Sequence, residues 1–299
     1  MSGRNVLLIA DIEGSSGCFD YEGSSFKTEK WASACADMTK DVDAVVRALF
    51  NAGARSVTVK DFHRTGYNLF TNLIDPRARI VSGYRNGPVP GIGDPTGHDT
   101  AMFIGMHAPS GSGGFLAHTM THRITSVRAN GTPVSELELF AGSLAPFGIR
   151  PVFFSGCPVA CDHANNAVPG MTICPIDKSS ASFDMKSWRE HCAESAAESL
   201  RNTAAFPYNP EGPFEIEISF RGGISEALSI ARKWKLKQSA DHVIFSVSCM
   251  PELFNRLIDI AYFTPVTRAV APFALPLYNI YGRAGILWAH KKLYAARNS

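Results

Sequence analysis

The sequence predicts an α/β fold with a largely parallel central sheet flanked by helices, a second, smaller α/β part and a C-terminal extension. Short runs rich in β-branched and apolar residues alternate with longer segments whose apolar residues recur at helical spacing. The chain has 299 residues, of which 45% are hydrophobic, so it can bury one large core or two moderate ones. We predict an α/β domain over residues 1–165, a second α/β portion over 166–270 and an extension over 271–299.

The first hundred residues contain three predicted strands and one long helix. Residues 6–10 form a short apolar run, which we predict as the first strand. Within residues 28–50 the apolar side chains recur every three or four positions, which predicts a helix, and Gly53 supplies a stop signal. Residues 56–60 and 101–106 are the next two predicted strands, and His63 and His107 follow them.

The rest of the chain continues this alternation. Asn130 and Gly131 lie between extended residues within 124–134, which is the strongest hairpin signal in the chain. A helix is predicted to begin near Val134 or Ser135. Further strands are predicted at 151–155, 214–220 and 243–247, and further helices at 187–201, 224–234 and 251–262.

Composition restricts the possible partners. The net charge is only +2 and the basic residues are scattered, so neither nucleic acid nor an anionic membrane is expected as a partner, and a small substrate is favoured. The first apolar run is too short for a secretory signal and no later run approaches the length of a membrane span, which predicts a cytoplasmic location. Seven cysteines without a C-x-x-C pair indicate core thiols, and neither a disulfide framework nor a thiolate zinc site.

Side chains able to bind a metal follow three of the predicted strands. Asp11 and Glu13 follow the first strand, His63 follows the second and His107 follows the third. Taken singly, such residues are usually turn, capping or structural groups. The carboxyl ends of parallel strands meet at one edge of a sheet, however, and imidazole together with carboxylate is a ligand set that zinc prefers. Their coincidence predicts a metal site at that edge.

The spacing of Asp11 and Glu13 supports this prediction. If the strand continued, both carboxylates would point to one face of the sheet and Ile12 to the other. The two carboxylates would then repel one another, and one would take up a proton unless a cation lay between them. A bound metal removes this penalty.

Three other segments leave alternatives open. His118 and His122 have the spacing of two ligands on one helix face, but Thr119 stands where an H-E-x-x-H site needs Glu, so one functional and one surface histidine is favoured. Residues 134–140 offer Glu136 and Glu138, and the sequence does not distinguish between them. Residues 110–114, "SGSGG", lack the lysine and helix of a phosphate-binding loop and are interpreted as a flexible loop.

Five ordered segments together resemble a known family. "DIEGSSG", "VKDFH", "FIGMHA", "LAHTM" and "PVSELELFAG" are similar to the successive signature segments of the zinc-dependent D-aminopeptidases, the DppA-type metallopeptidases. The intervals between Asp11, His63, His107, His118 and Glu136 also resemble the spacing of that family. The likeness continues more weakly to about residue 265, through the segment around Lys178 and "FEIEISF".

The resemblance implies a binuclear centre with two Zn²⁺ per subunit. The ligands it implies are Asp11, Glu13, His63, His107 and Glu136, and it therefore selects Glu136 over Glu138. It assigns His118 as a catalytic histidine that is not a ligand. If Asp11 bridges both ions and the other four ligands divide evenly, each ion has three protein ligands and keeps an open position, as in catalytic zinc sites.

The activity implied by the resemblance is that of an aminopeptidase. It would hydrolyse the N-terminal peptide bond of short peptides that contain D-amino acids, using a water activated between the ions and His118 as acid, base or oxyanion stabiliser. The family forms homo-oligomeric rings around a chamber, which would admit only small peptides.

Other functions remain open on the residues alone. A binuclear metal amidase could act on a small non-peptide amide, or a phosphoesterase could use the same centre. Against phosphoesters, no basic residue is evident at the predicted inner site, although Lys60 and Arg64 flank the end of the second strand. A non-catalytic, metal-stabilised oligomeric binding protein is the third alternative, which the presence of His118 disfavours.

Two features depart from the family pattern. Cys157 and Pro158 stand where relatives usually carry acidic residues, and Asp162 comes only later, which affects the expected pocket wall and substrate choice. Residues 271–299 extend beyond the usual end of the family. They are interpreted either as a cover for this subunit's own core or as an arm that docks on a neighbouring subunit.

Overall fold

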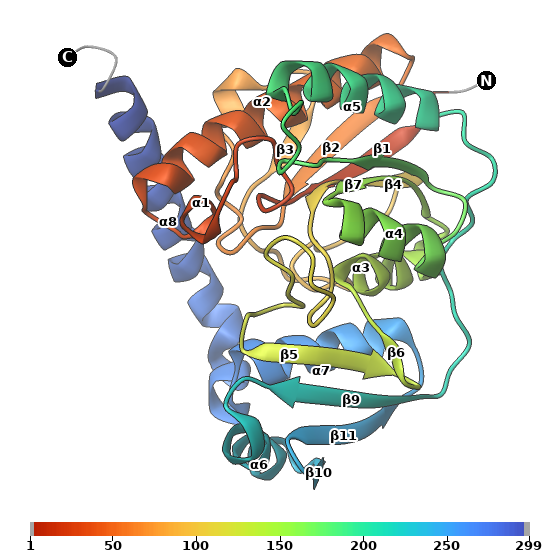
Figure 1. Cartoon of the computed structure of the whole chain (residues 1–299), viewed down its shortest axis with the longest axis vertical. Coiled ribbons are helices and arrows are strands. Elements are labelled where there is room, and N and C mark those ends of the chain that lie inside the picture. The colour runs from red at the N-terminus through yellow and green to blue at the C-terminus, as the bar shows by residue number, and fades with distance from the viewer. Residues whose placement is uncertain (1–2, 296–299) are drawn as a thin grey trace.

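The structure is a computed structural model, and it describes residues 3–295 (Figure 1). The expected fold class is confirmed: the chain forms an α/β fold with a parallel sheet, a second sheet and a long C-terminal helix. The strands are β1 Asn5–Ala10, β2 Ser56–Asp61, β3 Arg79–Val81, β4 Thr100–Met106, β5 Ile124–Ala129, β6 Thr132–Pro133, β7 Arg150–Gly156, β8 Thr172–Pro175, β9 Phe214–Phe220, β10 Lys237–Ser239 and β11 His242–Val247. The α-helices are α1 Tyr21–Ser24, α2 Glu29–Asn51, α3 Glu136–Leu144, α4 Pro158–Ala167, α5 Met185–Ser199, α6 Gly223–Trp234, α7 Met250–Tyr262 and α8 Pro265–Ala295.

The parallel sheet has the strand order β3-β2-β1-β4-β7-β8. Its order reverses between β1 and β4, because the chain first adds β2 and β3 on one side of β1 and then β4, β7 and β8 on the other. In open α/β sheets the crevice at such a reversal, outside the carboxyl ends of the strands, is where ligands bind. Asp11 follows β1 and His107 follows β4 at this point.

Both faces of the parallel sheet are covered. Alternate residues of β1 belong to different cores: Val6 and Leu8 pack with α2 and α5, whereas Leu7 and Ile9 pack with α3, α7 and the second sheet. The helix α2 begins at its N-cap Thr28, whose hydroxyl accepts a hydrogen bond from the Trp31 N–H. This double coverage explains why β1 and β4 are continuous apolar runs.

The second sheet is antiparallel, with the order β10-β11-β9-β5-β6. The predicted hairpin at Asn130 and Gly131 is present, and its strands β5 and β6 join β9 to β11 from much later in the chain (Figure 1). The predicted boundaries at 165 and 270 fall within α4 and α8, and the division into domains stays a prediction. Within residues 3–295, none of the helices combines the length and apolarity needed to span a membrane.

The C-terminal helix α8 lies along one side of the molecule (Figure 1). Near its middle, the side chain of Asn279 accepts a hydrogen bond from the Tyr84 N–H at 3.0 Å and donates one to the Tyr84 carbonyl at 3.2 Å. The hydroxyl of Tyr278 donates to the carbonyl of Arg64, in the loop that follows β2. Toward the C-terminus, Ala289 is completely buried against the core that contains α2. One face of α8 therefore covers this chain's own core.

Candidate metal centre

The predicted ligands meet at the reversal point of the parallel sheet. β1 ends at Ala10, so the strand does not continue through Glu13, and residues 11–14 form a turn. This turn needs close backbone contact with β4: a Cβ atom on Gly14 would lie 2.2 Å from the carbonyl oxygen of Met106, and one on Gly105 would lie 2.2 Å from that of Asp11. Gly105 also has φ +74°, which favours glycine.

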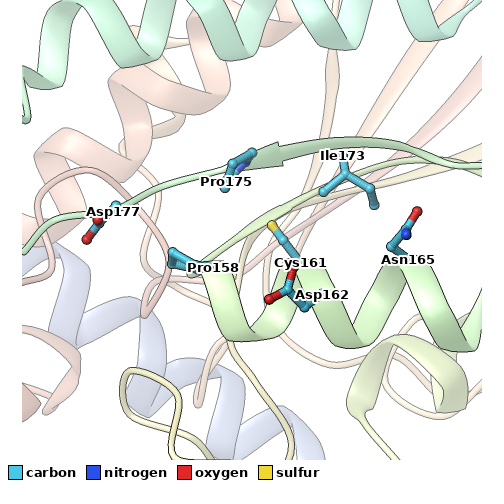
Figure 2. Close-up of a pocket in the computed structure, with 7 residues that line it drawn as sticks. All are labelled: Pro158, Cys161, Asp162, Asn165, Ile173, Pro175 and Asp177. Atoms are coloured by element: carbon cyan, nitrogen blue, oxygen red, sulfur yellow. The ribbon is translucent and has the colours of Figure 1, made fainter. Parts of the chain in front are cut away.

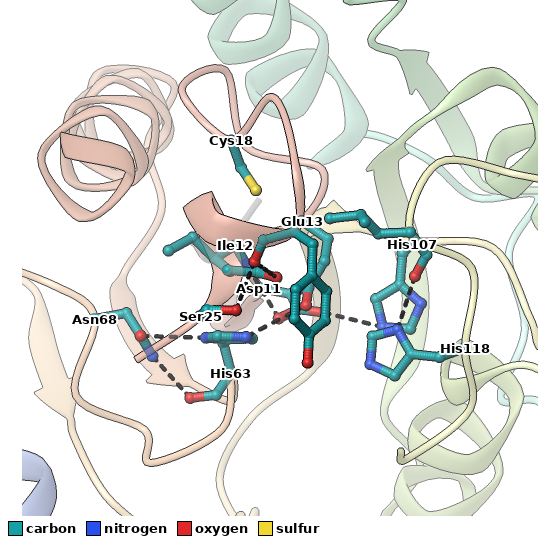
Figure 3. A network of polar contacts seen from close by, with 12 residues as sticks. Asp11, Ile12, Glu13, Cys18, Ser25, His63, Asn68, His107 and His118 are labelled. Carbon is teal, nitrogen blue, oxygen red and sulfur yellow. Dashed lines mark hydrogen bonds and ion pairs between the residues drawn. The ribbon is translucent and has the colours of Figure 1, made fainter. Parts of the chain in front are cut away.

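The first group of possible ligands consists of Asp11, Glu13 and His63, all buried. The Nε2 atom of His63 lies 3.3 Å from Oε1 of Glu13, between β1 and β2 (Figure 3). One carboxylate oxygen of Asp11, Oδ1, accepts a hydrogen bond from the Ile12 N–H at 2.9 Å. Its other oxygen, Oδ2, faces the second group and lies 3.4 Å from Nε2 of His107.

The second group consists of His107, His118 and Glu136. Nε2 of His107 lies 3.6 Å from Oε1 of Glu136, which begins helix α3. The same Glu136 oxygen accepts a hydrogen bond from the Met120 N–H at 2.7 Å. The rings of His107 and His118 stack with their centroids 3.8 Å apart (Figure 3). In each group, one candidate atom per residue lies within 4.8 Å of the others, and Asp11 links the two groups.

Buried polar atoms in these groups fit bound cations. Oε2 of Glu13 and Nε2 of His107 are buried and have no hydrogen-bond partner among the described residues. Three buried carboxylates lie close together, and burial, followed by the charges of Glu13 and Glu136, raises the pKa of Asp11 well above its ordinary value. Two dications would balance the negative charge of these carboxylates and coordinate the oxygen and nitrogen atoms that have no hydrogen-bond partner. The donor set therefore fits zinc.

A buried hydrogen-bond network orients His63. The Nδ2 group of Asn68 donates to Oδ1 of Asp61 at 2.9 Å and to the His63 carbonyl at 2.7 Å, and its Oδ1 accepts from Nε1 of Trp31 at 2.9 Å. The amide orientation of Asn68 is fixed by these contacts. Its Oδ1 lies 3.2 Å from Nδ1 of His63, so Nδ1–H is the donor and Nε2 keeps its lone pair toward Glu13 (Figure 3).

Main-chain carbonyls orient the other two histidines in the same way. Nδ1 of His107 lies 3.2 Å from the Ala108 carbonyl, and Nδ1 of His118 lies 2.9 Å from the Leu116 carbonyl. A carbonyl only accepts, so both Nδ1 atoms carry the proton and both Nε2 atoms are free to bind a metal or accept a proton. Burial, reinforced by the charge of His107, lowers the pKa of His118 below its ordinary value, which keeps this ring neutral near pH 7.

Lys178 secures the turn that carries Asp11 and Glu13. Its Nζ donates to the carbonyls of Glu13 at 2.6 Å, of Ser15 at 3.0 Å and of Cys18. The ammonium group also lies 4.2 Å from the centroid of the Phe115 ring. All three of its donors are used on the main chain of this turn, so Lys178 has a structural role beside the site.

Glu138 lies outside the candidate site, and His122 lies beside it but not on a helix. Oε2 of Glu138 accepts hydrogen bonds from the N–H and hydroxyl of Ser135, its helix cap, and lies 2.8 Å from Nε2 of His163, so it does not enter the site. Residues 113–122 are not helical. The His122 ring nevertheless lies 4.4 Å from that of His118 and 5.3 Å from that of Tyr21, measured between ring centroids.

A surface pocket of about 410 Å³ lies between α4 and β8 (Figure 2). None of the six candidate site residues lines it; the lining residues are Pro158, Cys161, Asp162, Asn165, Ile173, Pro175 and Asp177. Cys157 is the buried residue that precedes α4. Pro158 and Asp162, which depart from the expected pattern after β7, thus line a cavity separate from the candidate centre.

The profile of the D-aminopeptidase family, Peptidase_M55, matches residues 5–257, which is most of the chain. The chain belongs to this family. A curated member, the D-aminopeptidase of Bacillus subtilis, is 25% identical over 173 residues, which cover 57% of this chain and 62% of that relative. The matched part therefore spans less than two thirds of the relative's length.

A solved structure supports the fold of this M55 family member. It is described as the zinc-dependent D-aminopeptidase DppA from Bacillus subtilis, a self-compartmentalizing protease. It superposes with a TM-score of 0.77 and covers 85% of this chain and 96% of its own, at 22% sequence identity. At this identity the likeness establishes a shared fold.

Sequence reasoning missed the residues that hold the ligands in place. Asn68, Trp31 and Lys178 belong to no strand-end motif. Asn68 is five residues from His63, but Trp31 is 37 residues from Asn68 and Lys178 is 165 residues from Glu13. Their types carry no signal, because a tryptophan or a lysine in a helix or loop has many ordinary uses. Only the fold brings Lys178 to the turn after β1 and Trp31 to the loop after β2, where Asn68 lies.

Proposed function

We propose that this chain is a zinc-dependent aminopeptidase that removes the N-terminal residue of short peptides, with a preference for D-amino acids. The observation that carries the proposal is the convergence of three carboxylates and three histidines, from five separate segments, at the reversal point of the sheet. The D-preference is supported by the family description and by the name of the Bacillus subtilis relative.

The proposed ligands are Asp11, Glu13, His63, His107 and Glu136, with Asp11 shared between two ions. This sharing is supported by the position of Asp11, which is grouped with Glu13 and His63 and lies 3.4 Å from His107. Bound zinc would polarise the scissile carbonyl and lower the pKa of water from about 15.7 toward neutrality. The Nε2 atoms of His63 and His107 face carboxylate oxygens of Glu13 and Asp11, at 3.3 and 3.4 Å.

His118 is proposed as the group that moves the proton. Its Nδ1–H is held by the Leu116 carbonyl, so Nε2 is the atom that can take a proton from water and return it to the leaving amine. His118 is also close enough to His107 and Glu136 to act as a further ligand. A proton-transfer role is preferred because the other five residues already supply three ligands to each of two ions when Asp11 is shared.

We further propose that the protein assembles into a homo-oligomer that acts on small peptides. Support comes from the solved relative, which is described as a self-compartmentalizing protease and shares the fold. Enclosure of the sites would exclude folded proteins and restrict the substrates to short peptides.

Phosphoester hydrolysis is less well supported. Two lysines near the site, the buried Lys60 and the half-buried Lys178, donate to main-chain carbonyls: Lys60 to Asp61 and Gly83, and Lys178 to three residues of the loop after β1. They are thus not arranged to bind the additional negative charge of a phosphate.

The deciding experiment is a hydrolysis screen with zinc-supplemented protein. The substrates are short D- and L-peptides with free or acetylated amino termini, small non-peptide amides and nitrophenyl phosphate. We expect turnover of free-amine D-peptides and at least a hundredfold loss on acetylation. Equal turnover of acetylated peptides, or turnover of non-peptide amides alone, would indicate an amidase. Zinc binding with no turnover of any substrate would indicate a binding protein.

A further inference from the structure

The helix α8 has two apolar faces, and its own chain covers one of them. The covered face includes Asn279, Gly282, Gly285 and Ala289, which follow one another at intervals of three or four residues. A Cβ atom on Gly285 would lie 2.2 Å from the Phe26 ring, which shows how closely this face approaches the rest of the molecule. Asn279 bonds the Tyr84 main chain, and Ala289 is completely buried.

The opposite face carries a stripe of large apolar side chains, which we call the outer stripe. Each of these side chains is between 50% and 82% exposed: Val266, Val270, Phe273, Leu277, Ile280 and Leu287. Their spacing alternates between four and three residues, with the small, exposed Ala284 filling the remaining position. At about 100° per residue they form a single line, roughly half a turn away from the covered face.

This pattern is that of a helix with a partner on each side. A helix that packs on its own core and faces water on the other side is polar on the outer face, whereas a helix apolar all round is buried. Apolar residues in an alternating 3–4 repeat form the seam on which a second helix packs. The outer stripe keeps this repeat over about three heptads, which is long enough for a second helix to pack along it.

We propose that the outer stripe of α8 docks against the same stripe of a second copy of this chain. Six large side chains, each at least half exposed, present on the order of 600 Å². Two copies would then bury about 1,200 Å², which reaches the range of specific, stable interfaces. A contact of a surface with itself is the commonest arrangement in dimers.

The outer stripe and the basic residues of α8 both bear on the choice between a protein partner and a lipid surface. The outer stripe contains no charged residue, as in the core of a protein interface. A helix that binds anionic lipid carries basic residues that are free to reach the headgroups. Arg268 pairs with Asp259 at 2.7 Å and Lys292 pairs with Glu29 at 3.2 Å within the same chain. The exposed Arg283 and Lys291 have no ion pair among the described residues, so vesicle binding is measured beside self-association.

The inference rests on the homo-oligomeric part of the proposed function and is independent of its catalytic part. It also adds to that proposal, because α8 begins at Pro265 and lies beyond residues 5–257, which match the family. The outer stripe is thus an interface that the family match does not supply.

The test compares the mass of three zinc-loaded proteins by light scattering across a range of concentrations: the wild type, Leu277→Glu/Ile280→Glu and Phe206→Glu. Phe206 is 74% exposed and lies in the segment before β9, so it controls for replacing an exposed aromatic ring with a charge. We expect the double variant to dissociate at concentrations at least a hundredfold higher than the wild type, and the control to keep the wild-type mass. Zinc content should be unchanged in both variants and thermal unfolding unchanged in the control, because the outer stripe does not contact its own core; the double variant should lose only the stabilisation that association supplies.

A second measurement uses a single cysteine at the centre of the stripe. Leu277→Cys should give a covalent dimer with a short bismaleimide, since the central residue meets its counterpart in either helix orientation, whereas Phe206→Cys should not. A double variant with the wild-type mass, or the absence of the Leu277→Cys dimer, would overturn the proposal. A monomeric wild type that sediments with phospholipid vesicles would overturn it too, and would assign the stripe to lipid. Peptide hydrolysis, measured separately, reports on the catalytic proposal alone.

Discussion

The two halves of the candidate metal centre are held in place by different means. Around Asp11, Glu13 and His63, buried side chains do the positioning: Asn68 orients His63, and Lys178 binds the turn after β1. Around His107, His118 and Glu136, the main chain does it, through the carbonyls of Ala108 and Leu116 and the N–H of Met120. Metal binding in the first half should therefore be sensitive to substitutions of residues outside the ligand set. Metal binding in the second half should be much less sensitive to them.

The two halves also differ in what they can do. Every member of the first half is deeply buried, whereas His118 is only partly buried and lies on a loop whose neighbours Leu116 and Met120 have φ of +47° and +64°. Asp11 is the contact between the halves. A rigid half suits permanent ligands, and a more open half suits a group that exchanges protons with substrate.

The largest effect should come from removing the link between the halves. Asp11→Ala should lose both metal ions and reduce hydrolysis to background, because Asp11 faces both groups. Elemental analysis and a peptide assay measure this directly. Asp162→Ala is the control. It removes an exposed carboxylate from the separate pocket between α4 and β8 and should retain both the metal ions and the hydrolytic activity. Retention of two ions by Asp11→Ala would refute the sharing of Asp11.

The next largest effect should separate metal binding from proton transfer in the second half. His118→Ala should lower kcat by about 10²- to 10⁴-fold while the metal content stays at the wild-type level. Its ring neighbour provides the matched control, since His122→Ala should change kcat by less than tenfold. Loss of one ion in His118→Ala would instead make His118 a ligand.

A smaller effect should test the side-chain scaffold of the first half. Asn68→Ala removes the acceptor for Nδ1–H of His63 and should weaken zinc binding by about 10- to 100-fold, measured by competition with a chelator. Asn165→Ala, on α4, removes an exposed amide and should leave zinc affinity unchanged. Wild-type affinity in Asn68→Ala would mean that the His63 ring is held by packing alone.

The last effect lies outside the metal centre and concerns stability near the end of β2. Burial lowers the pKa of Lys60 to about 7, so between pH 7 and its ordinary value near 10.5 the unfolded chain binds a proton that the folded protein does not. The free energy of unfolding of the wild type, relative to Lys60→Met, should rise with pH across this window by about 1.4 kcal/mol per unit of pKa difference. Below pH 7 the difference in unfolding free energy between the wild type and Lys60→Met should not change with pH. Denaturant unfolding at several pH values measures it, and a difference that falls with rising pH would contradict the assignment.

Much of the fold was accessible from the sequence because its signals are local. The long helix α2 and the strands β1, β2 and β4 follow from apolar spacing, and the β5–β6 hairpin follows from Asn130-Gly131. The short strands β3, β8 and β10 were missed, since three or four residues carry too little periodicity. The pairing of β5 with β9 was also missed, because strand pairing between distant segments leaves no local trace.

By itself, the sequence determined which residue types stand at the ends of the strands. Asp11, Glu13, His63 and His107 were identifiable there because parallel strands end at a common edge. The family resemblance already selected Glu136 over Glu138, and the structure places Glu136 beside His107 while Glu138 caps its own helix. Only the tertiary structure decided that a turn rather than a strand presents Glu13, and that Asn68 and Lys178 secure the ligands. It also decided that α8 leaves one apolar face uncovered. The reason is that side-chain direction and burial depend on contacts between segments far apart in the chain.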